Sequence, residues 1–317
     1  MKSTFSLGGL AQAGSLPAGP LYLAIGMFDG VHLGHRAVVS AAVQSAQRGS
    51  GLSAVLTFWP HPSRLFRSND PVRQIQGPDL RARHLFGLGV DVVITEPFTS
   101  DFAAMEAEDF VPTLRRALTG LQTIYVGENW RFGRGRRGDV NLLLEEGRKV
   151  GLTVFSAPRV NFDGVPVSST RIRTDLESGE MARANSMLGY SYTSDGVVTP
   201  GKRLGRTLGF PTLNVPWNPE LRPRYGVYLV RIRTSGTTLW QPAVANYGLR
   251  PTTETATEPR LEVHVIGPCA GTEGDRVEVE WLDFVRPEQR FSSLDVLTSQ
   301  IAQDRAHAVR YFGLTEG

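Results

Sequence analysis

The chain has little cysteine, little lysine and no long apolar run. Its 317 residues contain one cysteine, Cys269, which excludes an internal disulfide and fits a reducing compartment. No apolar stretch is long enough to span a bilayer, and the N-terminus lacks the charged start and apolar core of a signal peptide. We therefore expect a cytoplasmic protein without a membrane partner.

Positive charge comes from arginine and is spread thinly along the chain. Lysine occurs only at Lys2, Lys149 and Lys202, and the formal net charge is +3. The arginines are scattered, apart from a small cluster between Arg131 and Arg137. Proteins that bind nucleic acid more often have a basic stripe or block. We therefore expect no nucleic-acid partner.

The first half of the chain alternates short apolar segments with segments of helical spacing. The predicted strands are Leu21–Ile25, Ser53–Phe58, Val90–Thr95, Thr123–Val126 and Leu152–Ala157. The predicted helices are Ala37–Ala46, Asp79–Leu88, Glu106–Leu118 and Val140–Val150. This alternation favours a Rossmann-like α/β domain, with a parallel sheet covered on both faces and ligands bound beyond the carboxyl ends of the strands.

The pattern changes near Leu188, where strands and turns replace the alternation. The predicted strands are Gly196–Val198, Gly226–Arg233, Leu239–Ala245, Leu261–Ile266 and Arg276–Trp281. Helical spacing returns at Ser293–Phe312, and two helical stretches, Thr170–Ser178 and Met181–Leu188, bridge the halves. We expect a nucleotide-binding domain over residues 1–187 and a small antiparallel β-barrel with a C-terminal helix over residues 188–317.

The segment GMFDGVHLGH, Gly26–His35, stands where a predicted strand turns into a predicted helix. The free N–H groups and positive dipole end of a helix favour phosphate at such a place. Imidazoles from His32 and His35 beside a triphosphate can stabilise the charge that develops as pyrophosphate leaves. The alternative is a metal pair, but such a site usually needs further ligands at a defined spacing, and none is evident nearby. The setting favours a nucleotide site.

A second glycine-rich segment, Gly201–Asn214, combines three glycines with Lys202, Arg203 and Arg206. It lacks the Walker A spacing but suits a loop that wraps a polyphosphate. Thr212 and Asn214 would point the same way on a strand, and their oxygens can orient Mg²⁺. The alternative is a glycine-rich β-hairpin with a Pro-Thr turn.

Glu262 is a third candidate for chemistry. On an alternating strand Glu262 and His264 share one face, whereas Leu261, Val263 and Val265 share the other. The Glu262 carboxylate could accept a proton from a substrate hydroxyl during phosphoryl transfer. The alternative is an exposed cross-strand charge pair.

These residues, taken in order, resemble the bacterial bifunctional riboflavin kinase/FMN adenylyltransferase (FAD synthetase) family. In the N-terminal half the matching segments are Gly26–His35, Phe58–Pro62, Val126–Gly133 and Ser168–Arg173. In the C-terminal half they are Gly205–Asn214, Gly226–Tyr228, Asn246, Pro251–Thr252, Glu262 and Phe291–Asp304. The resemblance covers nearly the whole chain, and the combination of motifs is far more specific than any one of them.

The resemblance implies an N-terminal site that transfers an adenylyl group from ATP to FMN. In this site, according to the resemblance, ATP is contacted by Gly26, Phe28, Gly30, His32, His35, Asn129, Ser169, Thr170 and Arg173. Phe58 and His61 would lie near the flavin. The FMN phosphate is already ionised, so catalysis should consist of positioning and charge stabilisation.

The resemblance also implies a C-terminal riboflavin kinase. Glu262 would be the base, and Thr212 and Asn214 would hold Mg²⁺ with ATP. The loop at Gly201, Lys202, Gly205 and Arg206 would cover the ATP phosphates. The expected partners are riboflavin, FMN and ATP, bound by a monomer or a weak homo-oligomer.

Some positions depart from the family pattern. Trp59 stands where the family has an acidic residue, and Leu213 replaces a small alanine. The segment after His264 lacks the family's acidic run and aromatic turn. This leaves open an adenylyltransferase whose barrel binds flavin without catalysis, although the intact Thr212, Asn214 and Glu262 argue against it. A tRNA-charging or RNA-binding protein with a similar His-x-Gly-His turn is disfavoured by the scattered arginines.

Overall fold

The computed structural model describes residues 4–201, 208–249, 258–268 and 271–315. The chain separates into two compact units, Met1–Ser169 and Thr170–Gly317. Lys202, Gly205 and Arg206, three residues expected to bind ATP, lie outside the described residues. No helix within the described ranges combines the length and apolar character that crossing a membrane requires.

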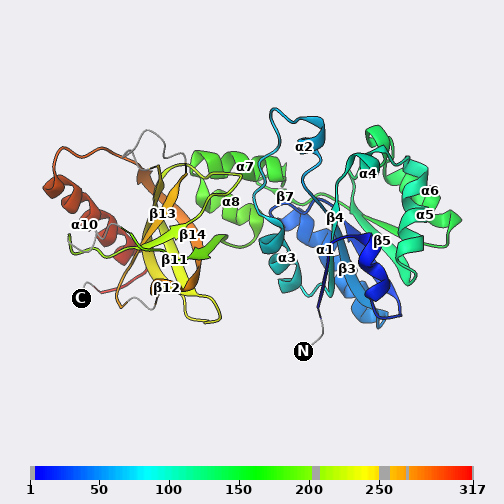
Figure 1. Cartoon of the computed structure of the whole chain (residues 1–317), viewed down its shortest axis with the longest axis horizontal. Coiled ribbons are helices and arrows are strands. Elements are labelled where there is room, and N and C mark those ends of the chain that lie inside the picture. Colours follow the sequence, from blue (N-terminus) through cyan, green and yellow to red (C-terminus); the bar gives the residue numbers. More distant parts are fainter. Residues whose placement is uncertain (1–3, 202–207, 250–257, 269–270, 316–317) are drawn as a thin grey trace. The chain divides into compact units, whose positions relative to one another are not determined.

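The first unit is built on a parallel sheet (Figure 1). Its strands are β1 (Phe5–Leu7), β2 (Leu21–Ile25), β3 (Leu52–Trp59), β4 (Val92–Pro97), β5 (Leu121–Gly127) and β6 (Thr153–Ala157). They lie in the order β1-β4-β3-β2-β5-β6, and every neighbouring pair is parallel. After β4 the chain crosses back over β3 and β2 to form β5, so the strand order reverses beside β2. Open α/β sheets bind ligands at the carboxyl ends of the strands at such a reversal.

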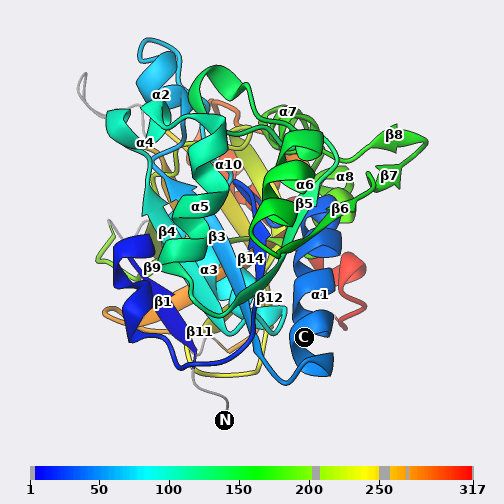
Figure 2. The same cartoon turned by 90° about the vertical axis from the view of Figure 1, so that its right-hand side faces the viewer.

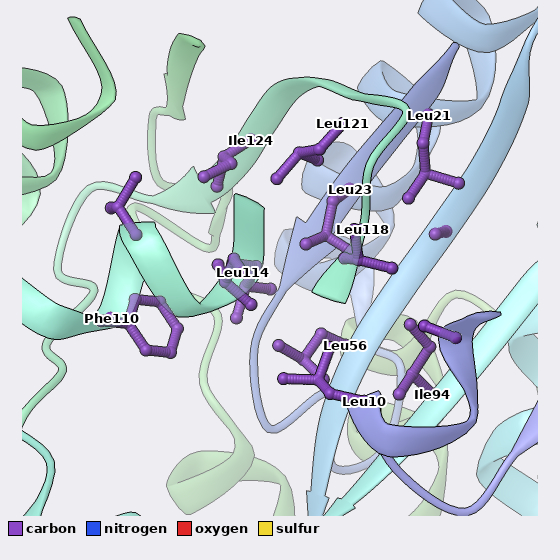
Figure 3. Packing of buried hydrophobic residues seen from close by; sticks show 14 of the residues in the cluster. Leu10, Leu21, Leu23, Leu56, Ile94, Phe110, Leu114, Leu118, Leu121 and Ile124 are labelled. Atoms are coloured by element: carbon purple, nitrogen blue, oxygen red, sulfur yellow. The ribbon is translucent and has the colours of Figure 1, made fainter. Parts of the chain in front are cut away.

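Helices cover both faces of this sheet (Figure 2). One face is covered by α1 (Leu33–Arg48) and α3 (Pro78–Gly87), which bury Val39 and Leu85 against it. The other face is covered by α5 (Ala107–Ala117) and α6 (Val140–Lys149), together with the short helix η1 (Leu10–Ser15). Figure 3 shows leucines from α5, the strands and η1 packed together on this second face. Burial of this apolar area fixes each helix on its side of the sheet.

The first unit also contains several short elements. They are α2 (Ser63–Phe66), α4 (Ser100–Ala104), η2 (Arg134–Arg136) and the hairpin of β7 (Asn161–Phe162) and β8 (Val165–Pro166). The helix α7 (Ser169–Ser178) begins at the last residue of the first unit and continues into the second, where α8 (Met181–Leu188) follows.

The second unit is a nearly closed antiparallel barrel. Its strands are β9 (Tyr192–Val197), β10 (Leu213–Pro216), β11 (Gly226–Thr234), β12 (Gln241–Gly248), β13 (Arg260–Val265) and β14 (Arg276–Pro287). They lie in the order β10-β13-β12-β11-β14-β9. An isolated bridge between Thr199 and Asn214 joins the end of β9 to β10 and so narrows the remaining gap.

Aromatic rings fill the interior of the barrel. Tyr228 meets Trp281 edge to face at 4.7 Å between ring centroids, and Trp217 lies 5.1 Å from Trp281. The outer face carries a separate apolar patch of Val227, Leu229 and Val244. The C-terminal helix α10 (Leu294–Tyr311) covers this patch with Ala308. The barrel therefore has a packed core and one helix-covered outer face.

The predicted fold class is confirmed in both units. β1, the β7–β8 hairpin and the short helices α2 and α4 were not predicted, because elements of two to five residues carry too little periodicity. Thr212 was expected on a strand with Asn214, whereas β10 begins only at Leu213.

Candidate active sites

The loop between β2 and α1 carries the two histidines of the first motif. His32 is the N-cap residue of α1, with an extended backbone, and His35 lies in the first turn of the helix. The predicted ATP-binding residues Gly26, Phe28 and Gly30 occupy the same loop. The loop therefore presents the N-terminal end of α1, with its positive dipole, at the carboxyl end of β2.

The rings of His32 and His35 are stacked. Their centroids are 3.5 Å apart with an interplanar angle of 15°. The backbone N–H of His35 donates to His32 Nδ1 at 3.3 Å, so a neutral His32 ring carries its proton on Nε2. His32 is only 5% exposed, and Phe28 meets His35 edge to face at 5.4 Å. The capping contact and the stack fix both imidazoles relative to the helix end.

The backbone of this loop is held in an unusual conformation. Phe28 and Val31 have φ values of 47° and 38°, in the left-handed region that side-chain-bearing residues rarely adopt, and Gly30 has φ 83°. The buried Asp29 carboxylate accepts hydrogen bonds from the backbone N–H groups of Ile75 and Gln76. Such a conformation persists only where the surroundings determine it, and Asp29 supplies part of that support.

Ser169 is a predicted site residue that contacts this loop directly. Its hydroxyl donates to the backbone carbonyl of Asp29 at 2.9 Å. Asn129 lies in the exposed turn after β5, the strand beside β2. Thr170 and Arg173 belong to the second unit, so their expected contacts with the nucleotide remain predictions.

An aromatic cluster lies at the carboxyl ends of β3, β4 and β5. Phe58 is 4% exposed, packs 5.5 Å from Phe102 and stacks on Trp130 at 6.4 Å. Phe98 meets Phe58 edge to face at 6.1 Å. His61 follows β3, and its Nδ1 accepts the backbone N–H of Ser63 at 3.1 Å. Phe58 therefore supports this edge of the sheet from within, whereas His61 is partly exposed on it.

The second unit brings Asn214 and Glu262 together by strand pairing. Asn214 on β10 is the cross-strand partner of Glu262 on β13, and Glu262 is in turn the partner of Asn246 on β12. Side chains of directly opposed residues lie on the same face, about 4.5–5.5 Å apart at Cβ. We call Asn214, Glu262 and Asn246 the polar row. It lies on the outer face of the barrel, which also carries Val227 and Val244.

A second carboxylate, Glu288, adjoins the polar row. It follows β14 and accepts hydrogen bonds from the Asn246 side chain and the Leu249 backbone N–H. Burial raises the pKa of Glu288, and the nearby charge of Glu262 raises it further, while the two hydrogen bonds oppose these effects. A Cβ atom at Gly248 would lie 1.9 Å from Glu288 Oε1, so glycine makes room for this carboxylate.

Gly201 and Asn214 are also in close contact. A Cβ atom at Gly201 would lie 2.0 Å from the Asn214 side-chain nitrogen. The side-chain oxygen of Asn214 is buried and has no hydrogen-bond partner among the described residues. A buried oxygen of this kind, opposite Glu262, fits the oxygen ligands that Mg²⁺ prefers. Within the described ranges, no three His, Cys, Asp or Glu side chains gather as a metal site.

His264 lies on the same strand face as Glu262, as the alternation predicts, while Leu261, Val263 and Val265 are buried on the other face. Its Nδ1 donates to the Pro211 carbonyl at 2.9 Å, and its ring meets Phe210 at 5.5 Å. Burial lowers the pKa of His264, and the charge of Arg305 on α10 lowers it further. A neutral His264 thus ties β13 to the segment that leads into Thr212.

The structure brings the predicted residues into two groups, one in each unit. The β2–α1 loop with Ser169 forms the first, and Asn214, Glu262 and Gly201 form the second. Sequence reasoning gave no role to Asn246 and did not find Glu288. The cross-strand alternation could have placed Asn246 near Glu262 only if the strand register had been known.

Comparisons with known proteins match each half of the chain to a family. A family model described as FAD synthetase matches residues 17–171, and one described as riboflavin kinase matches residues 188–312. The chain is similar to the bifunctional riboflavin kinase/FMN adenylyltransferase of Escherichia coli (strain K12), with 36% identity over 316 residues, 100% of this chain and 99% of the relative. The Bacillus subtilis (strain 168) protein of the same name is 32% identical, with 92% of each chain covered.

A solved structure has the same fold over nearly the whole length. It is titled as a macrolide-efflux protein from Streptococcus pneumoniae, and it matches with a TM-score of 0.83 at 27% sequence identity. The match covers 96% of this chain and 98% of that chain, so both units are present in both proteins.

Proposed function

The chain belongs to the bifunctional riboflavin kinase/FMN adenylyltransferase family, and from that premise we propose that it makes FAD in two steps. The second unit phosphorylates riboflavin to FMN, and the first unit transfers an adenylyl group from ATP to FMN. The observation that carries this proposal is that one chain holds both the stacked His32–His35 pair and the polar row around Glu262.

In the kinase step Glu262 accepts the proton of the riboflavin 5′-hydroxyl as its oxygen attacks the γ-phosphorus of ATP, and ADP leaves. Mg²⁺, when bound, neutralises charge on the phosphate oxygens. Thr212 and the buried oxygen of Asn214 would hold it. Asn246 and Glu288 orient Glu262, because Asn246 is the cross-strand partner of Glu262 and donates to Glu288. Gly201, Lys202, Gly205 and Arg206 would cover the phosphates.

In the adenylyl step the FMN phosphate attacks the α-phosphorus of ATP, and pyrophosphate leaves. No strong base is needed, because the attacking phosphate is already ionised. The Nε2–H of His32 and the ring of His35 stabilise the charge that develops on the phosphate oxygens, with the N-terminal end of α1 behind them. Asn129, Ser169, Thr170 and Arg173 would contact the ATP phosphates, with Phe58 and His61 near the flavin.

We place the functional boundary so that residues 1–187 form the adenylyltransferase and residues 188–317 the kinase. The two family models, at residues 17–171 and 188–312, support this division. We further propose that the protein works in the cytoplasm as a monomer or a weak homo-oligomer.

The test is direct assay of both steps on one preparation. Purified protein with riboflavin, ATP and Mg²⁺ should form FMN and then FAD, and with FMN in place of riboflavin it should form FAD alone. Chromatography separates the three flavins. If no FMN forms from riboflavin while added FMN is still adenylated, the barrel is a non-catalytic flavin-binding module. If neither product forms, the proposed function is wrong.

A further inference from the structure

A buried arginine contacts the loop between β2 and α1, which is the nucleotide loop of the first unit. Arg81 belongs to α3 and is 1% exposed. Its Nη1 donates to the Met27 carbonyl at 3.0 Å, to Thr57 Oγ1 at 3.1 Å and to the Phe58 carbonyl at 3.5 Å. The first and third of these partners belong to two different predicted substrate segments, the β2–α1 loop and the end of β3.

The other end of the guanidinium holds a third segment. Arg81 Nη2 donates to the side-chain oxygen of Gln74 and, at 3.3 Å, to the Gln76 carbonyl. The backbone N–H groups of Ile75 and Gln76 donate in turn to the Asp29 carboxylate at 3.0 Å and 3.2 Å. The segment 74–76 is thus bound to Arg81 on one side and to the nucleotide loop on the other.

Thr57 closes the network. Its hydroxyl donates to the Met27 carbonyl at 2.9 Å, so this carbonyl receives hydrogen bonds from both Thr57 and Arg81. Met27 directly precedes Phe28, the first residue of this loop with positive φ. The network therefore holds the part of the loop where the backbone has an unfavourable positive φ.

Burying a guanidinium is expensive unless its donors are used, and apolar side chains of similar volume often stabilise a core as well or better. A buried arginine with this set of partners contributes fixed geometry, since its planar fork meets carbonyls at set directions. We propose that Arg81 is a positioning residue of the adenylyl-transfer site. It holds the His32–His35 loop and the Phe58 segment in register without touching the substrate. This inference rests on the proposed function of the first unit.

The test compares Arg81→Met with the matched control Arg83→Met, an exposed arginine on the same helix. We expect kcat for FAD formation from FMN to fall about 100-fold in Arg81→Met, because a displacement of about 1 Å at a catalytic group costs roughly that much. KM for ATP should change less than about threefold, since the histidines act on charge that develops in the transition state. FMN formation from riboflavin on the same preparation should be unchanged, and Arg83→Met should retain both activities.

A spectroscopic readout separates positioning from a general loss of structure. In ¹⁵N-histidine-labelled protein the stacked rings of His32 and His35 shift each other's resonances. Arg81→Met should move these two signals and leave His264 and His307, in the second unit, in place. FAD formation within threefold of the wild type, a loss confined to KM, or unmoved His32 and His35 signals would each overturn the proposal.

Arg81→Lys keeps the test decisive if Arg81→Met does not fold. Lysine keeps the charge, but its single ammonium group does not span the carbonyls of both Met27 and Gln76. We expect FAD formation to fall about 10-fold. Full activity with lysine would overturn the proposal, because charge alone would then suffice. Wild-type protein that makes no FAD from FMN would instead refute the proposed function on which this inference rests, whereas a failure seen only in the Arg81 variants overturns the inference alone.

Discussion

The two units place their functional side chains by different means. In the parallel sheet the candidate residues lie in loops after the strands, and a helix end and a buried network hold the loop that carries His32 and His35. In the barrel two of them, Asn214 and Glu262, lie on the strands themselves, where pairing sets them opposite each other. A site on loops depends on what supports the loops, whereas a site on a strand face depends on register.

This difference predicts where each site is vulnerable. The first site should respond to changes in supporting residues that touch no substrate, since its loop is held in an unfavourable conformation. The second should respond mainly to the residues of the row and their direct partners, since neighbouring strands hold the backbone along its whole length.

Removal of both histidines should abolish the activity of the first unit and leave that of the second. We expect His32→Ala/His35→Ala to lower FAD formation from FMN about 10⁴-fold, because each donor to a developing charge is worth roughly 10²–10³. FMN formation from riboflavin should stay within twofold of the wild type. Steady-state assays of both steps on one preparation measure this. Near-normal FAD synthesis would show that the stacked pair has no catalytic part.

Glu262→Gln should abolish the activity of the second unit and leave that of the first. We expect FMN formation to fall about 10³-fold, within the range given by loss of a general base, while added FMN is still adenylated at the normal rate. The glutamine keeps the volume and a hydrogen-bonding oxygen at the same place in the polar row. Loss of both activities would mean that the units do not work independently, and the comparison between them would fail.

The smallest expected effect concerns Glu288 and pH. The folded pKa of Glu288 lies above its unfolded value near 4.5, so the stability that protonation supplies is present below about pH 4.5 and is lost as pH rises through the folded pKa. Glu288→Gln does not titrate. Relative to the wild type, its Tm should therefore rise across this window and level off above it. Thermal unfolding from pH 4.5 to pH 7.5 measures the difference.

Asp275 supplies a control of opposite sign. Hydrogen bonds from the Thr272 backbone N–H and hydroxyl hold the pKa of Asp275 below its usual value. Its contribution to stability is therefore present above the unfolded pKa and is lost as pH falls through the folded one. At pH 7 Asp275→Asn should lower Tm where Glu288→Gln raises it. The same direction for both variants would contradict the interpretation of Glu288.

Much of the fold could be predicted because its elements are long and periodic. Five of the six strands of the first sheet and the helices between them were predicted near their observed ends. The helix after Gly26–His35 starts earlier than predicted, at Leu33, because His32 caps it and so brings His35 into its first turn. The three-residue β1 was missed because only its pairing with β4 makes it a strand.

The sites were predictable in their motifs but not in their supporting contacts. Glu262 and Asn214 stood out by residue type and segment, yet their pairing depends on register, which local sequence does not encode. Arg81 and Glu288 lie in segments without a motif, and their partners Met27 and Asn246 are distant along the chain. Such partners become visible only when the chain is folded.

Gly201 is a residue that we expect to matter for activity and not for stability. An alanine there would meet the movable amide of Asn214 and not rigid backbone. The barrel can therefore accommodate Gly201→Ala by rotating the Asn214 amide, with little change in the free energy of unfolding. A library screened for soluble, heat-resistant protein would retain alanine at this position, whereas a library screened for growth on riboflavin as the sole flavin source would discard it.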